Sequence, residues 1–118
     1  MILYINTGDN EKVSLAIKDK DKIVAQKNFR ARYQQAEKLL PEIDKLLRAN
    51  KIKLNNLKEI IVENQGSSFT ALRIGVITAN ALGFALGIPV QPTKGKALTK
   101  TGFSIVKPEY DREPNISC

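Results

Sequence analysis

Residues 63–75, with the sequence ENQGSSFTALRIG, place a Gly-Ser turn directly before an apolar helix, as phosphate-binding loops do. The N–H groups at the start of such a helix can hold an anion. Alternatively, Ser67 or Ser68 can cap the helix by accepting a hydrogen bond from one of them. A P-loop needs a Lys followed by Ser or Thr after its last glycine, and a dinucleotide fingerprint needs three glycines at fixed spacing. Only Gly66 is present and residues 70–71 supply no Lys, so the spacing favours a helix cap formed by Gly66, Ser67 and Ser68.

Few residues in this chain are of the types that carry catalysis. There is no histidine, the commonest general base and zinc ligand, and the one cysteine is Cys118. A single cysteine forms no disulfide within the chain, which suits a reducing cytoplasm. No acidic side chain is spaced with a base partner as nucleophilic or acid–base catalysis requires. We therefore predict no catalytic residue, no metal site and no cofactor, after considering Asp9, Glu11, Glu37, Glu42, Asp44, Glu63, Glu109, Asp111 and Glu113.

The chain is basic, with 19 Lys and Arg against 12 Asp and Glu and a formal net charge of +7. The excess is spread along the chain, although Thr93–Lys100 holds three lysines and no acid. A basic surface attracts nucleic acid or an acidic partner protein, and it also keeps a protein soluble. Both interpretations remain open at this stage.

The 118 residues are enough for one ordinary domain, and short turns separate its first three predicted strands. Strands over 2–7, 12–18 and 22–29 predict an antiparallel meander. A consecutive apolar run in 58–64 is typical of a central strand, and a further strand is expected over 88–92. With helices over 33–51 and 68–86, the order is β-β-β-α-β-α-β, an α/β domain with a mixed sheet.

The last residues give weaker signals. We expect one helical turn over 94–100, an edge strand over 103–106 and a tail at the end of the chain. The domain is therefore predicted to span residues 1–104, followed by a C-terminal tail over 105–118.

The two predicted helices differ in their apolar patterns. In the first, the spacing of three and four residues marks an amphipathic helix, in which Pro41 predicts a kink or an irregular start. The second is apolar on nearly every face, with small residues at 75, 79, 83 and 87 that let the sheet or a foreign helix approach closely. It contains Arg73 and Asn80, and a central Arg opposes membrane insertion by roughly 2.5–3.5 kcal/mol, so we expect no membrane span. Any strip left exposed would be a partner surface.

Three segments resemble the bacterial TsaB (YeaZ) family of tRNA threonylcarbamoyladenosine biosynthesis proteins. They are AEKLLPEIDKLL (36–47), SSFTALRIGVITANALGFALGIPV (67–90) and PEYDREPNI (108–116). The resemblance implies a single RNase H-like lobe of the actin, heat-shock chaperone and sugar-kinase (ASKHA) fold. It also implies a cytoplasmic, non-catalytic subunit that binds and activates a catalytic TsaD-type paralogue as a heterodimer. A TsaE-type ATPase subunit would join the complex, and the protein would bind tRNA as part of that complex.

The resemblance also implies where such a partner binds. Family members pair through the two helices of the first lobe, here near 34–50 and 68–86. The expected polar contacts are Glu37 and Arg73. The expected apolar contacts, for which ordinary core packing is an equal alternative, are Leu40, Ile43, Leu47, Ile74, Ile77 and Ala81. An isolated chain could self-associate through the same helices as a homodimer.

The chain departs from the family pattern at several positions. Asn6-Thr7 stands where the family has Asp-Thr, Gln35 stands where a His is frequent, and the loop glycines and proline are replaced by residues 65–67. The second lobe has no counterpart, which predicts a naturally reduced protein in which a cleft between lobes cannot form. Two alternatives stay open: a small nucleotide-binding protein or hydrolase of the same fold, based on the turns at Thr7-Gly8 and 66–68, and a basic RNA-binding module.

Overall fold

A computed structural model describes residues 1–9, 11–32, 34–66, 68–93, 98–100, 103–105 and 109–110. The elements follow the predicted order, with one short additional strand before the second helix and others in the last third of the chain. They are β1 (Ile2–Asn6), β2 (Lys12–Asp19), β3 (Lys22–Arg30), α1 (Gln35–Ala49), the 3-10 turn η1 (Leu54–Asn56), β4 (Glu59–Val62), β5 (Gln65–Gly66), α2 (Phe69–Leu86), β6 (Val90–Pro92), β7 (Leu98–Lys100), β8 (Phe103–Ile105) and β9 (Glu109–Tyr110).

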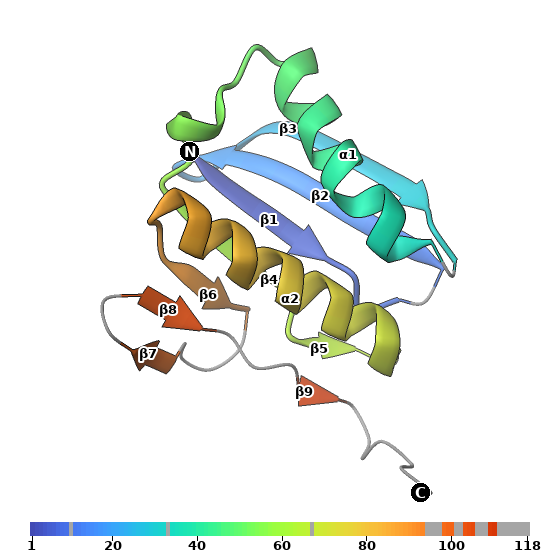
Figure 1. Cartoon of the computed structure of the whole chain (residues 1–118). Helices are drawn as coiled ribbons and strands as arrows, with labels where there is room; N and C mark the ends of the chain where they lie inside the picture. The colour runs from blue at the N-terminus through green and yellow to red at the C-terminus, as the bar shows by residue number, and fades with distance from the viewer. Residues whose placement is uncertain are drawn as a thin grey trace, which may run out of the picture.

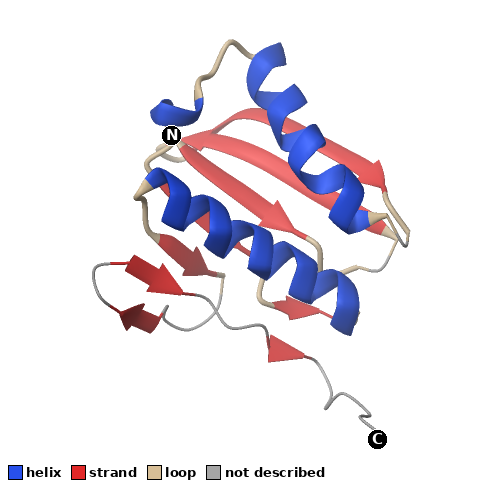
Figure 2. Ribbon diagram, in the orientation of Figure 1, coloured by secondary structure: helices blue, strands red, loops and turns tan. Residues whose placement is uncertain are grey.

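Five strands form the main sheet in the order β3-β2-β1-β4-β6. The pairs β1–β2 and β2–β3 are antiparallel, whereas β1–β4 and β4–β6 are parallel, so the sheet is mixed as predicted. Helix α1 connects β3 to β4, and α2 connects β4 to β6. Both helices lie on the same face of the sheet and pack beside each other (Figures 1 and 2). This arrangement is the RNase H-like lobe that the family resemblance implies.

The core lies between the sheet and the two helices. Leu3 pairs with Ile17 on one side and with Ile60 on the other, so three fully buried side chains form a row across β2, β1 and β4. Because side chains alternate between the faces of a strand, the next buried row is two residues further along each strand. The helices cover these rows with side chains at helical spacing, chiefly Leu39, Ile43, Leu46, Leu47, Leu72, Val76 and Ala79.

Helix α1 is continuous from Gln35 to Ala49, although Pro41 lies within it. A kink or an irregular start before the proline was expected, and no interruption is found. Pro41 cannot donate to the carbonyl of Glu37, four residues earlier. Both residues are on the exposed side of the helix, where water can satisfy that carbonyl.

Helix α2 begins and ends with defined caps. The side chain of Ser68 accepts a hydrogen bond from the Ala71 N–H at 3.3 Å, and Gly87 adopts a left-handed conformation with φ of 67°. Gly75, Ala79 and Gly83 of the small-residue row face the sheet, whereas Gly87 is exposed. A Cβ atom at Gly75 would be 2.1 Å from Thr7 Oγ1, and one at Gly83 would be 2.2 Å from Val90 Cγ2. Of the two expected uses of this row, close approach to the sheet is the one found.

The last third of the chain differs from the prediction. Leu98–Lys100 is strand β7 instead of part of a helical turn, and residues 94–97 lie outside the described residues. Strand β8 pairs antiparallel with β7 in a separate ladder and does not extend the edge of the five-stranded sheet. Within the expected tail, β9 pairs in parallel with β5, and residues 111–118 lie outside the described residues. Neither helix, over the residues described, is long and apolar enough to cross a membrane.

Candidate functional site

An apolar groove lies between α1 and α2 on the side of the helices that faces away from the sheet. It encloses about 250 Å³ and is lined by Leu40 from α1 and by Ile77, Thr78, Ala81 and Leu82 from α2. We call this feature the α1–α2 groove. The two helices that form it lie side by side in front of the sheet in Figure 1.

The apolar side chains of the groove are unusually exposed. Ile77 is 55% exposed and Leu40 is 51% exposed, and Phe84, two turns beyond Ile77 on α2, is 68% exposed. Single exposed apolar residues are common on monomers, but neighbouring ones mark surfaces that bind a partner. The α1–α2 groove is therefore a candidate protein-binding surface.

The sequence of α2 explains why this strip is exposed. Arg73, Ile77, Ala81 and Phe84 are separated by four, four and three residues, which places them on one face of the helix. The opposite face, with Val76 and the small-residue row, packs on the sheet. Since α2 is apolar all round and the sheet covers one side only, an apolar strip remains on the outside.

The structure separates the predicted contact residues into three groups. Leu40, Ile77 and Ala81 line the groove. Ile43 and Leu47 are each 2% exposed, so they belong to the core, which was the alternative to partner contact, and they do not form part of the outer surface.

The remaining predicted contacts lie beside the groove. Ile74 is partly buried and packs against the core, whereas Glu37 and Arg73 are exposed in the first turns of their helices. Sequence reasoning did not select Thr78, Leu82 or Phe84. The seven-residue spacing from Ile77 to Phe84 is the signal that would have found the last of these.

The loop before α2 is closed by contact between two backbones. A Cβ atom at Gly66 would be 2.5 Å from the Cα of Gly8 and 2.6 Å from its carbonyl oxygen, so glycine is required there by close approach. The Ser68 N–H donates to the Gly8 carbonyl at 3.3 Å, and the Ser68 side chain caps the helix. Ser67 lies outside the described residues. In the described part of the loop, Gly66 and Ser68 both have structural roles.

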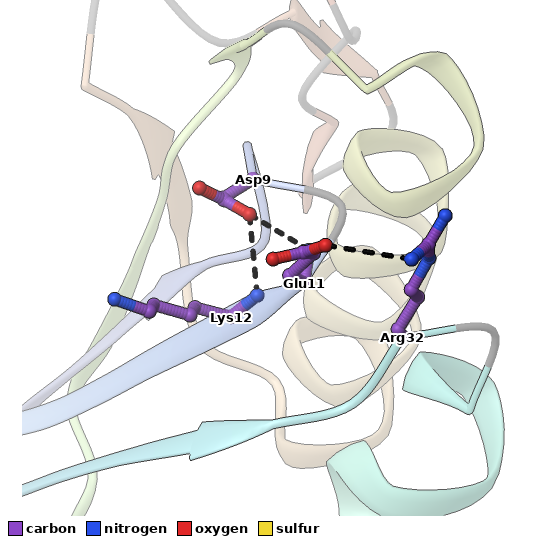
Figure 3. Close-up of polar contacts among 4 residues, drawn as sticks. All are labelled: Asp9, Glu11, Lys12 and Arg32. Carbon is purple, nitrogen blue, oxygen red and sulfur yellow. Dashed lines mark hydrogen bonds and ion pairs between the residues drawn. The ribbon is translucent and has the colours of Figure 1, made fainter.

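The turn between β1 and β2 is held by side chains, as Figure 3 shows. Asp9 Oδ1 accepts hydrogen bonds from the backbone N–H of Glu11 at 2.7 Å and of Lys12 at 3.3 Å. The Glu11 carboxylate forms an exposed ion pair with Arg32 at 3.6 Å. The Asp9 carboxylate is thus used to shape the turn.

A polar cluster lies where the parallel strands β1, β4 and β6 end. Glu63 Oε1 accepts from Thr93 Oγ1 at 2.8 Å, and Oε2 accepts from the Tyr4 hydroxyl at 3.5 Å. Burial, and then the nearby charge of Glu63, raise the pKa of Tyr4 above its ordinary value. Asn6 Nδ2 donates to the Tyr4 hydroxyl at 3.5 Å. Over the described residues, no three His, Cys, Asp or Glu side chains gather as metal ligands would.

Comparison with solved structures identifies the fold. The chain resembles YeaZ from Pseudomonas aeruginosa with a TM-score of 0.71 and 25% identity, over 79% of this chain and 43% of that one. It also resembles an uncharacterized protein with similarity to peptidase YEAZ from the same organism, with a TM-score of 0.72, 25% identity and coverage of 79% and 42%. The chain thus spans less than half the length of both. The predicted resemblance to TsaB-type proteins is confirmed.

Sequence comparison leads to the same group of proteins. No curated protein matches the chain. The family model of TsaD, described as tRNA N6-adenosine threonylcarbamoyltransferase, matches residues 29–99. This match extends from the end of β3 to β7, includes both helices of the groove and covers more than half of the chain. The chain therefore belongs to the TsaD family.

Proposed function

We propose that this protein is a non-catalytic subunit that binds a catalytic TsaD-type paralogue and activates it to form N6-threonylcarbamoyladenosine in tRNA. A TsaE-type ATPase would act on the same complex. The family match and the YeaZ-like fold support a role in this modification system. The exposed α1–α2 groove is the observation that supports the role of a partner subunit.

The physical basis of the proposal is the apolar surface of the groove. Burying the exposed parts of Leu40, Ile77 and Phe84 against another protein would remove apolar area from water, which stabilises association by about 25 cal/mol per Å² before the entropic costs. The groove provides a recess in which an apolar side chain of the partner can insert. Interface energy is concentrated in such recessed, desolvated centres.

The roles of Glu37 and Arg73 in this proposed interface follow from their positions. Both are exposed near the amino ends of their helices, at the margin of the apolar strip. Polar residues at the rim of an interface set orientation and association rate more than affinity. We therefore assign the apolar residues to affinity and these two charged residues to orientation.

The test is co-purification of the full 118-residue chain with the catalytic TsaD-type paralogue of the same organism. Ile77→Asp and Ala81→Arg each place a charge in the α1–α2 groove and should reduce affinity for the paralogue at least tenfold. Modification of tRNA adenosine by the mixture should fall in parallel. Circular dichroism checks that each variant remains folded.

Ile23→Asp is the matched control, because Ile23 is 51% exposed, close to the 55% of Ile77, and lies on the edge strand β3 away from the groove. This variant should retain both binding and modification. If the Ile77 and Ala81 variants bind the paralogue as well as the unchanged chain does, the groove is not the interface.

A further inference from the structure

Six lysines lie at the end of the molecule where β1 and β4 begin. They come from the end of β2, the β2–β3 turn, the start of β3 and the segment between α1 and β4. We call this set the lysine edge: Lys18, Lys20, Lys22, Lys51, Lys53 and Lys58.

Backbone pairing brings these segments together. Ile2 pairs with Lys18 in β2 and with Glu59 in β4, so the residues flanking the two strand ends are neighbours. The Lys58 N–H donates to the Met1 carbonyl at 2.8 Å. Figure 1 shows the start of β1, η1 and the carboxyl end of α1 at the same end of the fold.

A second chain of hydrogen bonds continues from Met1 toward Lys53. The backbone nitrogen of Met1 donates to the Asn56 carbonyl at 3.1 Å. The Asn56 N–H donates to the Lys53 carbonyl at 2.9 Å, and the Lys53 N–H donates to Asn56 Oδ1 at 2.9 Å. The lysines of this edge are therefore held on ordered backbone.

The lysine edge carries most of the surplus charge of the described domain. Residues 1–93 contain 14 Lys and Arg and nine Asp and Glu, a net of +5. The six lysines are accompanied by three acids, Asp19, Asp21 and Glu59, so the edge accounts for +3 of this total.

Within the part of the chain that the structure describes, no ion pair neutralises the surplus at this edge. Ion pairs between described residues involve Lys27, Arg32, Lys45 and Arg48, none of which belongs to the lysine edge. Five of the six lysines are exposed, and the ammonium of the sixth, Lys18, lies 5.6 Å from the centre of the Tyr4 ring. The opposite edge differs, since its turn is balanced by Asp9 and by the Glu11–Arg32 pair (Figure 3).

Two of these lysines occupy turns that disfavour their side chains. Lys20 has a φ of 58° and Lys51 a φ of 56°, and over the described residues these are the two non-glycine positions with positive φ. A left-handed conformation costs roughly 1–2 kcal/mol for a residue with a Cβ, and glycine or asparagine adopts it more easily. Conformational preference therefore does not explain why lysine occupies these two turns. The remaining property of the side chain is its positive charge, for which the fold itself gives no reason.

We propose that the lysine edge binds the phosphate backbone of RNA. Ammonium groups on separate turns, with no carboxylate partner among the described residues, can contact successive phosphates and release their counterions. The identification of that RNA as tRNA rests on the proposed function. Helix α1 runs nine residues from Leu40 to its last residue, Ala49, or about 13.5 Å of helical rise, and Lys51 follows beyond its end, so RNA at this edge and a protein in the groove can be bound together.

The test measures binding of the full chain alone to an unmodified tRNA transcript that reads an ANN codon, by fluorescence anisotropy between 50 and 200 mM salt. Lys20→Asn with Lys51→Asn removes two charges at turns that asparagine tolerates. Affinity at 50 mM salt should fall about tenfold, and the slope of log K against log salt should decrease by about 1–2. Lys20→Arg with Lys51→Arg should retain binding.

The matched control is Lys12→Gln with Arg30→Gln. These two exposed cations are opposite each other in the β2–β3 register, away from the lysine edge. The double substitution removes the same charge and should leave affinity within about twofold. The proposal is overturned if this control weakens binding as much, if the Asn variant binds normally, or if the unchanged chain binds phosphatidylserine vesicles or acidic protein but no tRNA. The binding assay contains no catalytic paralogue. Its result therefore does not depend on whether the proposed heterodimer forms.

Discussion

Gly75 in α2 lies directly against Thr7 at the end of β1, so that a Cβ atom at position 75 would be 2.1 Å from Thr7 Oγ1. Thr7 is fully buried, and its hydroxyl has no hydrogen-bond partner among the described residues. The contact sets the distance between α2 and the sheet, because neither residue can grow without moving the helix.

Gly75→Ala should lower the free energy of unfolding by about 1–2 kcal/mol. Overpacking costs roughly 1–3 kcal/mol, and it exceeds the gain in helix propensity of about 1 kcal/mol. Adding Thr7→Ala removes the clashing hydroxyl and should restore part of the loss. Urea unfolding of the four forms of this double-mutant cycle measures the coupling, and additive effects would show that the two residues do not constrain each other.

Ser68→Ala should lower the free energy of unfolding by about 1 kcal/mol, because it leaves the Ala71 N–H at the start of α2 without its side-chain acceptor. Ser68→Asp should keep the cap and add a favourable interaction with the helix dipole. Thermal unfolding by circular dichroism compares the two variants. Equal loss of stability in both would contradict the capping role.

Glu42→Gln should destabilise the protein near neutral pH and have less effect in acid. The hydrogen bond from Lys27, opposed by desolvation and aided by the charges of Lys27 and Lys45, lowers the pKa of Glu42 below its ordinary value of 4.5. A lowered pKa stabilises the fold above pH 4.5, and that stabilisation is lost as the pH falls through the folded-state pKa. We expect a difference of about 0.5 kcal/mol at pH 7 that narrows between pH 5 and pH 3.

Asp44→Asn provides the control for this pH dependence. It removes an exposed pair with Arg48 on the same helix, whereas the Glu42 side chain is only 15% exposed. Exposed helical pairs contribute about 0.3–0.5 kcal/mol and are screened by salt. Urea unfolding at each pH, in low and high salt, should show the smaller and more salt-sensitive effect for Asp44→Asn.

The isolated chain should form a dimer at high concentration, because the α1–α2 groove is present on each copy and can pair with its counterpart about a two-fold axis. Sedimentation velocity over a concentration series measures this. Leu40→Asp should remain monomeric, and the exposed-strand variant Ile23→Asp should dimerise like the unchanged chain. Dimers that persist in Leu40→Asp would place the contact elsewhere.

Much of this fold could be predicted from local sequence. The first three strands have short polar turns between them, and α2 ends at Gly87 in the left-handed conformation that is typical of a glycine directly after a helix. The β7–β8 ladder could not be predicted, because Leu98–Lys100 carries no alternating pattern and its pairing depends on a strand elsewhere in the chain. Tertiary pairing here overrode a weak helical preference.

The candidate site could be predicted only in part, for a geometric reason. The apolar residues of α1 form a wide stripe, and successive residues turn by about 100°. Leu39 and Ile43 lie near the middle of that stripe and are buried, whereas Leu40 lies at its margin and is exposed. The sequence defines the stripe, but the position of α2 beside it decides which members face outward.

The small residues on the inner side of α2 have a further consequence. Gly75 and Gly83 fix the position of the helix against Thr7 and Val90 through contacts that the outer strip does not share. Substitutions at Ile77, Ala81 or Phe84 can therefore alter what the surface recognises without repacking the core. Partner specificity can therefore change with little loss of folding stability. The same fold could in this way bind different partner proteins in different evolutionary lineages.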